Sequence, residues 1–142
     1  MYRYYIPNAY SFWNVGIDSH LATTLTNQSE INRIYGAGFV SFFNVSYRIL
    51  ASPGNNTIPI YECMNPNFIS LDKNCDGKTF IRLSGYLYKT AVANSVAIYS
   101  KIYVPISHSY PYYWTTQDIN EGVGTVERIL GYGLLKTTYT NA

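Results

Sequence analysis

Two stretches of this chain follow the same order of residue types, and this internal similarity constrains the fold more than any other feature. The shared plan is an aromatic strand with Ser or Thr, a polar turn with Asn, an acidic residue and Gly, then Thr-apolar-x-Arg-apolar and Gly-Tyr. It runs over residues 67–90 and, with a two-residue insertion, over residues 112–137. Self-similarity at a period of about 20–50 residues is typical of domains built from one small repeated unit.

A more divergent copy precedes these two. Its Thr23-Thr24 and Arg33-Ile34 align with Thr115-Thr116 and Arg128-Ile129 of the last copy. A Tyr-bearing strand and a Pro turn come before each copy, at residues 2–7, 60–66 and 98–105. We therefore expect a single domain, 1–142, made of three repeats with boundaries at about 1–55, 56–93 and 94–142.

Each unit reads as a short strand, a turn, a second strand, one or two helical turns and a closing strand. The helical piece is clearest in the first copy, where Asn27 is a helix cap, Glu30 follows three residues later as a capping box requires, and Ile31 and Ile34 share one face. A unit this small cannot bury its apolar face alone, so three must share a core. The sequence predicts a mainly β fold with short helical turns, arranged as a pseudo-threefold domain that is either β-trefoil-like or a small α+β cluster.

The two cysteines, Cys63 and Cys75, lie twelve residues apart (75 minus 63) inside the second copy. A disulfide closing such a loop would stabilise the fold by about 3 kcal/mol through its effect on the unfolded chain. Two buried free thiols are the alternative, and a metal site is disfavoured because two Cys without a nearby His do not make a tetrahedral ligand set. A disulfide favours an oxidising, exported context.

Composition excludes several partners. The net charge of +2 comes from Lys and Arg scattered along the chain, so the basic run expected of a nucleic-acid binder is missing. Apolar stretches are far shorter than the ~20 residues of a spanning helix, so we expect no membrane insertion. Aromatic residues make up 17% and charged residues 13%, and this mixture of Tyr with Ser, Gly and Asn is typical of binding surfaces.

The chain resembles a repeat family of secreted bacterial and fungal proteins, often appended to hydrolases or surface proteins. Family units read "Pro-Leu-Tyr-Arg-x-Tyr-Asn-Pro … Asp-His-Phe-Tyr-Thr-Thr … Glu … Gly-Tyr", with a variant "Tyr-Arg-Cys … Ser-x-Asp-x-Asn-Cys-Glu-Gly … Leu-Gly-Tyr". The first form is matched by residues 2–7, 18–24 and Glu30, apart from an insertion after Pro7. The Cys form is matched by residues 61–63, 70–77 and 83–86, whereas the third copy has lost both His and Cys.

This resemblance covers almost the whole chain and implies export, pseudo-threefold architecture and ligand binding. It supplies no catalytic residues. Met1 is followed at once by strand-like sequence without a signal peptide, so the chain is either cytosolic or a piece excised from a longer chain. We expect the second, with the longer chain exported and the module placed outside the cell or at its surface.

Catalysis finds little support in the residues. No Gly-x-Ser-x-Gly elbow is present, and His20 and His108 fall in different repeats. Asp18 and His20 share a strand face but make an incomplete metal site. Carboxylates for glycoside hydrolysis fall mostly in turns, where Asx hydrogen bonding or helix capping explains them: Asp72, Asp76, Asp118, Glu121 and Glu127. We expect no enzyme activity, no cofactor and no metal.

Two aromatic insertions that depart from the repeat are the candidate ligand-binding segments, because function on a scaffold usually resides in such loops. A Trp or Tyr ring can stack on a sugar while Asp, Asn and His bond its hydroxyls. The alternative for either Trp is that it fills the core. The candidate residues are Trp13, Asn14, Asp18 and His20 in the first insertion, and His108, Tyr110, Tyr112 and Trp114 in the last.

The sequence therefore favours an extracellular module that binds carbohydrate or a cell-surface glycan, such as the tip of a fibrous adhesin. A fibre tip would be a homotrimer. The alternative is an accessory domain of a secreted cell-wall or polysaccharide hydrolase, and a third is a structural spacer.

Overall fold

The computed structural model describes residues 1–12, 15–36, 40–45, 47–64, 66–104, 112–121 and 124–134. Their elements in chain order are β1 (Tyr2–Phe12), β2 (Val15–Thr23), α1 (Gln28–Tyr35), β3 (Val40–Val45), β4 (Thr57–Met64), β5 (Phe68–Ser70), the 3-10 turn η1 (Cys75–Gly77), β6 (Thr79–Tyr88), β7 (Ser95–Tyr103), β8 (Tyr112–Thr116) and β9 (Thr125–Leu134). The predicted mainly β fold with short helical turns is confirmed.

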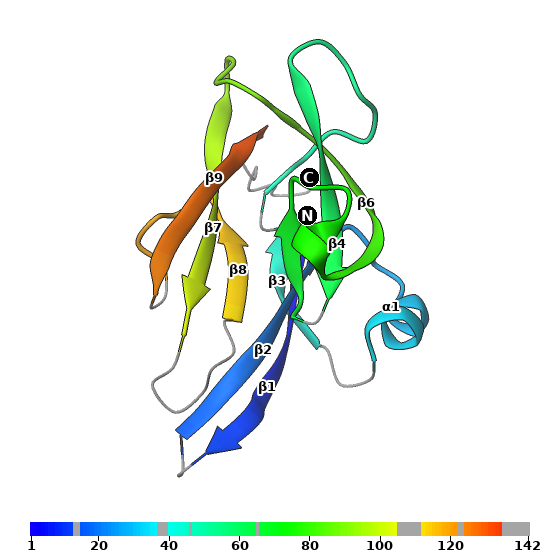
Figure 1. Cartoon of the computed structure of the whole chain (residues 1–142), viewed down its shortest axis with the longest axis vertical. Coiled ribbons are helices and arrows are strands. Elements are labelled where there is room, and N and C mark those ends of the chain that lie inside the picture. Colours follow the sequence, from blue (N-terminus) through cyan, green and yellow to red (C-terminus); the bar gives the residue numbers. More distant parts are fainter. Residues whose placement is uncertain are drawn as a thin grey trace, which may run out of the picture.

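The strands form two antiparallel sheets. One has three strands in the order β2-β1-β3, and the other has six in the order β5-β4-β6-β9-β7-β8. In Figure 1, β7 and β9 lie on the left, β4 and β6 on the right, and the β1–β2 ribbon extends below them.

The two halves of the six-stranded sheet have the same hydrogen-bonding register. Tyr61 on β4 pairs with Ser70 and Leu83, as Tyr99 on β7 pairs with Thr116 and Ile129. Ladders in both halves shift just after an Ile–Gly pair, Ile60–Gly85 and Ile98–Gly131. Bulges of this kind twist a strand locally, so the two hairpins bend at the same place.

Glycine is required at these two bulges because the backbone of a neighbouring segment comes very close. A Cβ on Gly85 would lie 2.7 Å from the Leu50 carbonyl oxygen, and one on Gly131 would lie 2.8 Å from that of Tyr88. Any side chain there would push neighbouring strands apart. The Gly-Tyr pairs that recur in the repeated pattern lie inside β6 and β9.

Three backbone contacts join the ends of the strands to one another. Arg48 exchanges two hydrogen bonds with Leu134, and Leu50 exchanges two with Tyr86. On β6 and β9, Tyr88 pairs with Tyr132. The segment after β3 thus connects both halves of the large sheet, while the threefold repeat itself, trefoil-like or otherwise, stays a prediction.

The helix forms where the capping pattern predicts it. The Asn27 side chain accepts hydrogen bonds from the backbone N–H groups of Ser29 (2.9 Å) and Glu30 (3.2 Å), which satisfies two of the donors that a helix start leaves open. Ile31 and Tyr35 are the buried residues of α1.

Two apolar clusters form the core. The larger one joins the sheets and contains Met1, Tyr47, Ile60, Ile69, Leu87, Ile98 and Leu130. The smaller one fixes the helix against β2 through Leu21, Ile31 and Tyr35. In the described part of the chain, no helix is long and apolar enough to cross a membrane.

Candidate functional site

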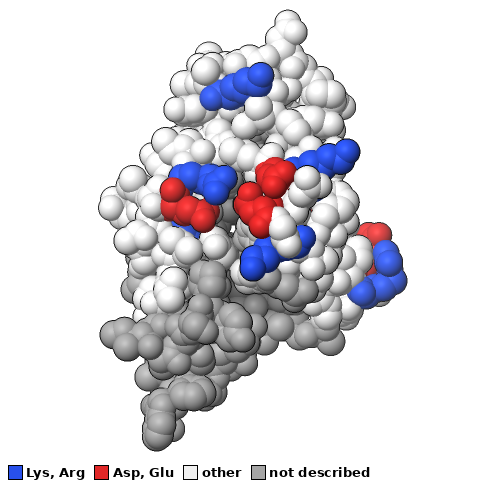
Figure 2. Space-filling model, viewed as in Figure 1, with Lys and Arg blue, Asp and Glu red and all other residues white. Residues whose placement is uncertain are grey.

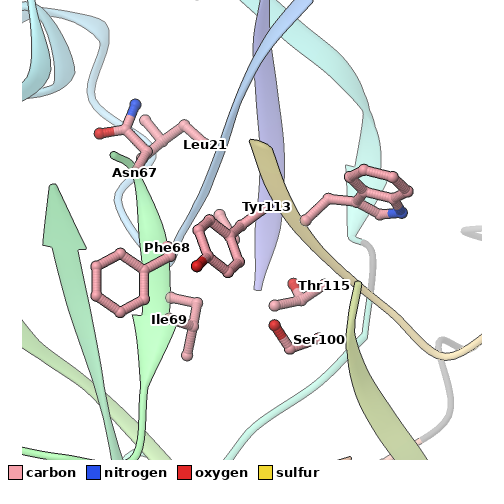
Figure 3. Close-up of a pocket in the computed structure, with 9 residues that line it drawn as sticks. Leu21, Asn67, Phe68, Ile69, Ser100, Tyr113 and Thr115 are labelled. Carbon is pink, nitrogen blue, oxygen red and sulfur yellow. The ribbon is translucent and has the colours of Figure 1, made fainter. Parts of the chain in front are cut away.

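A cleft lies where the second strand of each predicted unit, β2, β5 and β8, comes together with the others (Figure 3). Each of the three strands contributes consecutive residues, and β7 adds one. The lining residues are Leu21 and Ala22, then Asn67, Phe68 and Ile69, then Tyr113, Trp114 and Thr115, and finally Ser100.

Aromatic rings form one wall of the cleft. The rings of Phe68 and Tyr113 have centroids 5.4 Å apart and planes tilted by 36°, and both residues are partly exposed. Figure 3 shows them facing each other from different strands. Such a pair holds its shape because aromatic contacts favour offset and tilted arrangements. It presents a rigid apolar surface to a ligand.

The polar groups of the cleft fall into two kinds. Ser100 donates to Glu127 (3.2 Å), and Thr115 accepts from the Tyr47 hydroxyl (2.9 Å), so these two are engaged in the protein. By contrast, the Asn67 side-chain amide and the Tyr113 hydroxyl form no hydrogen bond with another described residue. These two groups can bond a ligand without breaking an existing contact.

The phenol of Tyr113 stays protonated at neutral pH. Burial raises its pKa above the ordinary value, and the nearby Glu127 and Asp76 carboxylates raise it further, while Arg128 acts in the opposite direction. A protonated phenol both donates and accepts hydrogen bonds.

The cleft is small. Its free volume of about 10 Å³ is room for roughly one water molecule. A sugar ring is much larger, so any glycan would lie across the mouth and contact the aromatic wall from outside.

Trp114 has a supporting position at this cleft. Its indole lies over Lys101, whose Nζ is 5.7 Å from the ring centroid, and a Cβ on Gly124 would come 3.1 Å from the indole. The ring therefore packs against the start of β9 as well as lining the cleft, and its removal would disturb both.

Glu62 is the most deeply buried acidic side chain in the described region, with 1% of its surface exposed. Its carboxylate accepts hydrogen bonds from side chains on β2, α1 and β6 and from one backbone N–H. The donors are Thr23 (2.6 Å), Thr24 N (3.3 Å), Tyr35 (2.5 Å), Arg82 (2.8 Å) and Ser84 (2.6 Å). With its acceptors occupied, this carboxylate joins the helix and the first sheet to the second one.

Two of the carboxylates considered for glycoside hydrolysis, Asp72 and Asp118, hold turns together, as the sequence analysis expected for most of that set, whereas Glu127 lies on β9. Asp72 accepts from the backbone N–H of Asn74 and of Asp76, each at 3.0 Å, and Asp118 accepts from that of Asn120 at 3.0 Å. Within the described residues, no three His, Cys, Asp or Glu side chains are close enough to hold a metal ion.

Most candidate binding residues from the sequence fall where the structure gives no side-chain geometry. Trp13, Asn14, His108 and Tyr110 lie outside the described residues. The backbones of Asp18 and His20 belong to β2 and that of Tyr112 to β8, whereas the positions of their side chains lie outside the description. Trp114 is the predicted residue that the structure places in the cleft.

The sequence analysis missed Asn67, Phe68 and Tyr113. A usable signal was present, because the internal alignment of residues 67–90 with 112–137 brings Phe68 and Tyr113 to the same strand position, and Asn67 directly precedes β5. Tyr113 lies between two predicted binding residues, Tyr112 and Trp114, whereas Asn67 and Phe68 belong to the second copy, for which no aromatic insertion was predicted.

The predicted disulfide is present. Cys63 on β4 is bonded to Cys75 in η1, with Cα atoms 5.9 Å apart, and both residues are buried. A stable disulfide fits an oxidising environment.

Comparison of the chain with protein-family models, with curated proteins and with solved structures finds no match.

Proposed function

We propose that this protein is an extracellular glycan-binding module and that the cleft between β2, β5 and β8 is its binding site. The observation that carries the proposal is the pairing of an aromatic wall, Phe68 and Tyr113, with two polar groups that have no described partner, the Asn67 amide and the Tyr113 hydroxyl. Aromatic faces match the apolar faces of sugars, and amides and phenols match their hydroxyls.

The position of the cleft supports this proposal. Its walls come from rigid strands of both sheets, so the groups that would contact a ligand are preorganised and lose little conformational entropy on binding. Because the cleft is shallow, the affinity of one site would be modest. We propose that the module is exported, as its disulfide suggests, and acts as the tip of a trimeric fibre, where three copies would raise avidity.

Binding to a broad glycan array tests the site, with Phe68→Ala, Asn67→Ala and Tyr113→Phe beside the wild type. We expect Tyr113→Phe, which removes one hydrogen-bonding oxygen, to weaken binding by roughly threefold to tenfold. Phe68→Ala removes the stacking surface and should weaken it more. Tyr132→Phe on β9, outside the cleft, is the matched control and should bind as the wild type does.

Thermal unfolding of each variant separates a binding defect from a folding defect. A module that binds no glycan on arrays of animal, plant and microbial sugars would contradict the proposal. Co-sedimentation with insoluble cell-wall polysaccharides without array binding would favour the accessory domain of a hydrolase instead. Sedimentation velocity tests the trimer.

A further inference from the structure

The surroundings of the cleft carry a charge pattern that bears on which glycans it accepts. On the face of the molecule in Figure 2, acidic and basic side chains lie beside one another without a large patch of one sign. The charged groups that lie next to the cleft are those that would act most strongly on a bound ligand.

Two carboxylates are attached to the cleft through serine hydroxyls. Ser100, a lining residue, donates to Oε1 of Glu127 (3.2 Å) on β9. On β5, Ser70 follows the lining residue Ile69 directly and donates to Oδ2 of Asp76 (3.3 Å) in η1. These bonds hold one acidic group from each half of the large sheet beside the aromatic wall.

Basic groups near the cleft offset these charges incompletely at the Tyr113 end. Arg128 is close to Glu127, with 3.6 Å between Nε and Oε1, but 41% of its side chain is exposed and water screens it. Lys101 is buried, and its Nζ donates to the carbonyl oxygens of Ile119 (3.1 Å) and Glu121 (2.7 Å) instead of to the cleft. The charged groups that act on the Tyr113 phenol are Glu127, Asp76 and Arg128, two acidic and one basic.

We infer that the cleft accepts neutral or amino-bearing sugars and discriminates against sialylated, sulfated and other anionic glycans. The inference rests on the proposed function, because it specifies the ligand class of the same site. An anionic substituent placed at Asn67 and Tyr113 would meet Glu127 and Asp76 and would lack an unengaged basic partner among the described residues of the cleft. A sugar ammonium group would be attracted to the same two carboxylates.

The test uses an array on which each glycan core is printed in neutral, sialylated and sulfated forms, with glucosamine oligomers beside N-acetylglucosamine oligomers. We expect every bound core to be bound more tightly in its neutral form than in its anionic form. Glu127→Gln removes the charge but keeps an oxygen that can accept the hydrogen bond from Ser100. This variant should reduce the ratio of affinities for the neutral and anionic forms by roughly threefold to tenfold. Arg128→Gln, which removes the nearby positive charge, should increase the same affinity ratio.

Glu30→Gln is the matched control, since Glu30 is a half-exposed helix carboxylate with an arginine at 3.8 Å and lies on α1, away from the cleft. It should leave the preference unchanged. Binding with equal affinity for neutral and anionic forms, or a Glu127→Gln variant identical to wild type, would overturn this inference while leaving glycan binding intact. No binding to any printed glycan would remove both proposals together.

Discussion

Each half of the large sheet, β4–β6 and β7–β9, holds a turn against its first strand. The two halves hold these equivalent turns by different chemistry. Cys63 pairs with Phe68 and Phe80 in its ladder, as Lys101 pairs with Trp114 and Val126. In the first half, Cys63 is bonded covalently to Cys75. In the second, the Lys101 ammonium donates to the carbonyl oxygens of Ile119 and Glu121.

The turns that these contacts hold are built alike. Ser70 accepts from the backbone N–H of Asp72 (2.9 Å), as Thr116 accepts from that of Asp118 (3.0 Å). Cys75 and Glu121 each donate a backbone N–H to the carbonyl of the Asp three residues earlier. The comparison shows that this backbone tolerates either a covalent attachment or hydrogen bonds from a charged group, provided that the turn stays on the strand.

A second difference lies one residue earlier on each strand, at Glu62 and Ser100. Glu62 reaches across to Thr23, Thr24 and Tyr35 of the first unit, whereas Ser100 bonds within its own hairpin to Glu127. The first half is therefore the one that attaches the helix, and its buried carboxylate should matter more to stability.

Glu62→Ala should have the largest effect, lowering the free energy of unfolding by about 3–5 kcal/mol, because it leaves Arg82 and several buried hydroxyls without their acceptor. Urea unfolding followed by circular dichroism measures it. Ser100→Ala at the equivalent position should cost less than about 1 kcal/mol. Equal losses in the free energy of unfolding for the two variants would show that the Glu62 carboxylate is not what holds the helix and the first sheet to the large sheet.

Removal of the disulfide in Cys63→Ala/Cys75→Ala should lower the free energy of unfolding by about 3 kcal/mol, as expected for a loop of this length. The urea midpoint of the double variant, compared with that of the oxidised wild type, gives the value. An unchanged midpoint would mean that the surrounding hydrogen bonds suffice to hold the turn.

Lys101→Met should cost about 2 kcal/mol, because it leaves two carbonyl oxygens without their charged donor while Met still packs against Trp114. The converse experiment places the disulfide of the first half in the second. Lys101→Cys/Glu121→Cys should oxidise spontaneously, which intact-mass measurement before and after reduction detects. Two thiols that stay reduced in air would contradict the equivalence of the two turns.

Tyr35→Phe should have a small effect at neutral pH, about 1 kcal/mol, from loss of one hydrogen bond to Glu62. Burial first, and the Glu62 carboxylate second, raise the pKa of Tyr35 in the folded state above its unfolded value of about 10. This tyrosine therefore favours folding fully below about pH 10, and that contribution is lost as the pH rises further. Urea unfolding at pH 8, 10 and 11 should show a shallower alkaline loss for Tyr35→Phe than for the wild type.

Local signals in the sequence predicted local structure well. Asn27 and Glu30 located the helix start, and the Cys63–Cys75 spacing predicted the disulfide, because capping and loop closure depend on neighbouring residues. The alignment of Arg33 with Arg128 was wrong, since Arg33 lies on α1 and Arg128 on β9. A helix in place of a strand shifts the register of the first unit, and residue types alone did not reveal that shift.

Long-range features were beyond the sequence analysis. The strand sequence around Glu62 gives no indication that this acidic residue is buried. It is buried because Thr23 and Tyr35, which belong to the first unit, pack against it and donate hydrogen bonds to its carboxylate. The cleft has the same origin, because Phe68 and Tyr113 meet only when β5 and β8 converge. No pattern within one unit specifies such a meeting.

The hydrogen bonds between Arg48 and Leu134 connect residues 86 positions apart (134 minus 48). Ribosomes add about 5–20 residues per second, so roughly 4–17 s pass between the synthesis of these two partners. During that interval, Arg48 has been synthesised but its hydrogen-bonding partner on β9 has not. The pace of translation, as well as the physics of its strands, thus sets when this part of the fold can close.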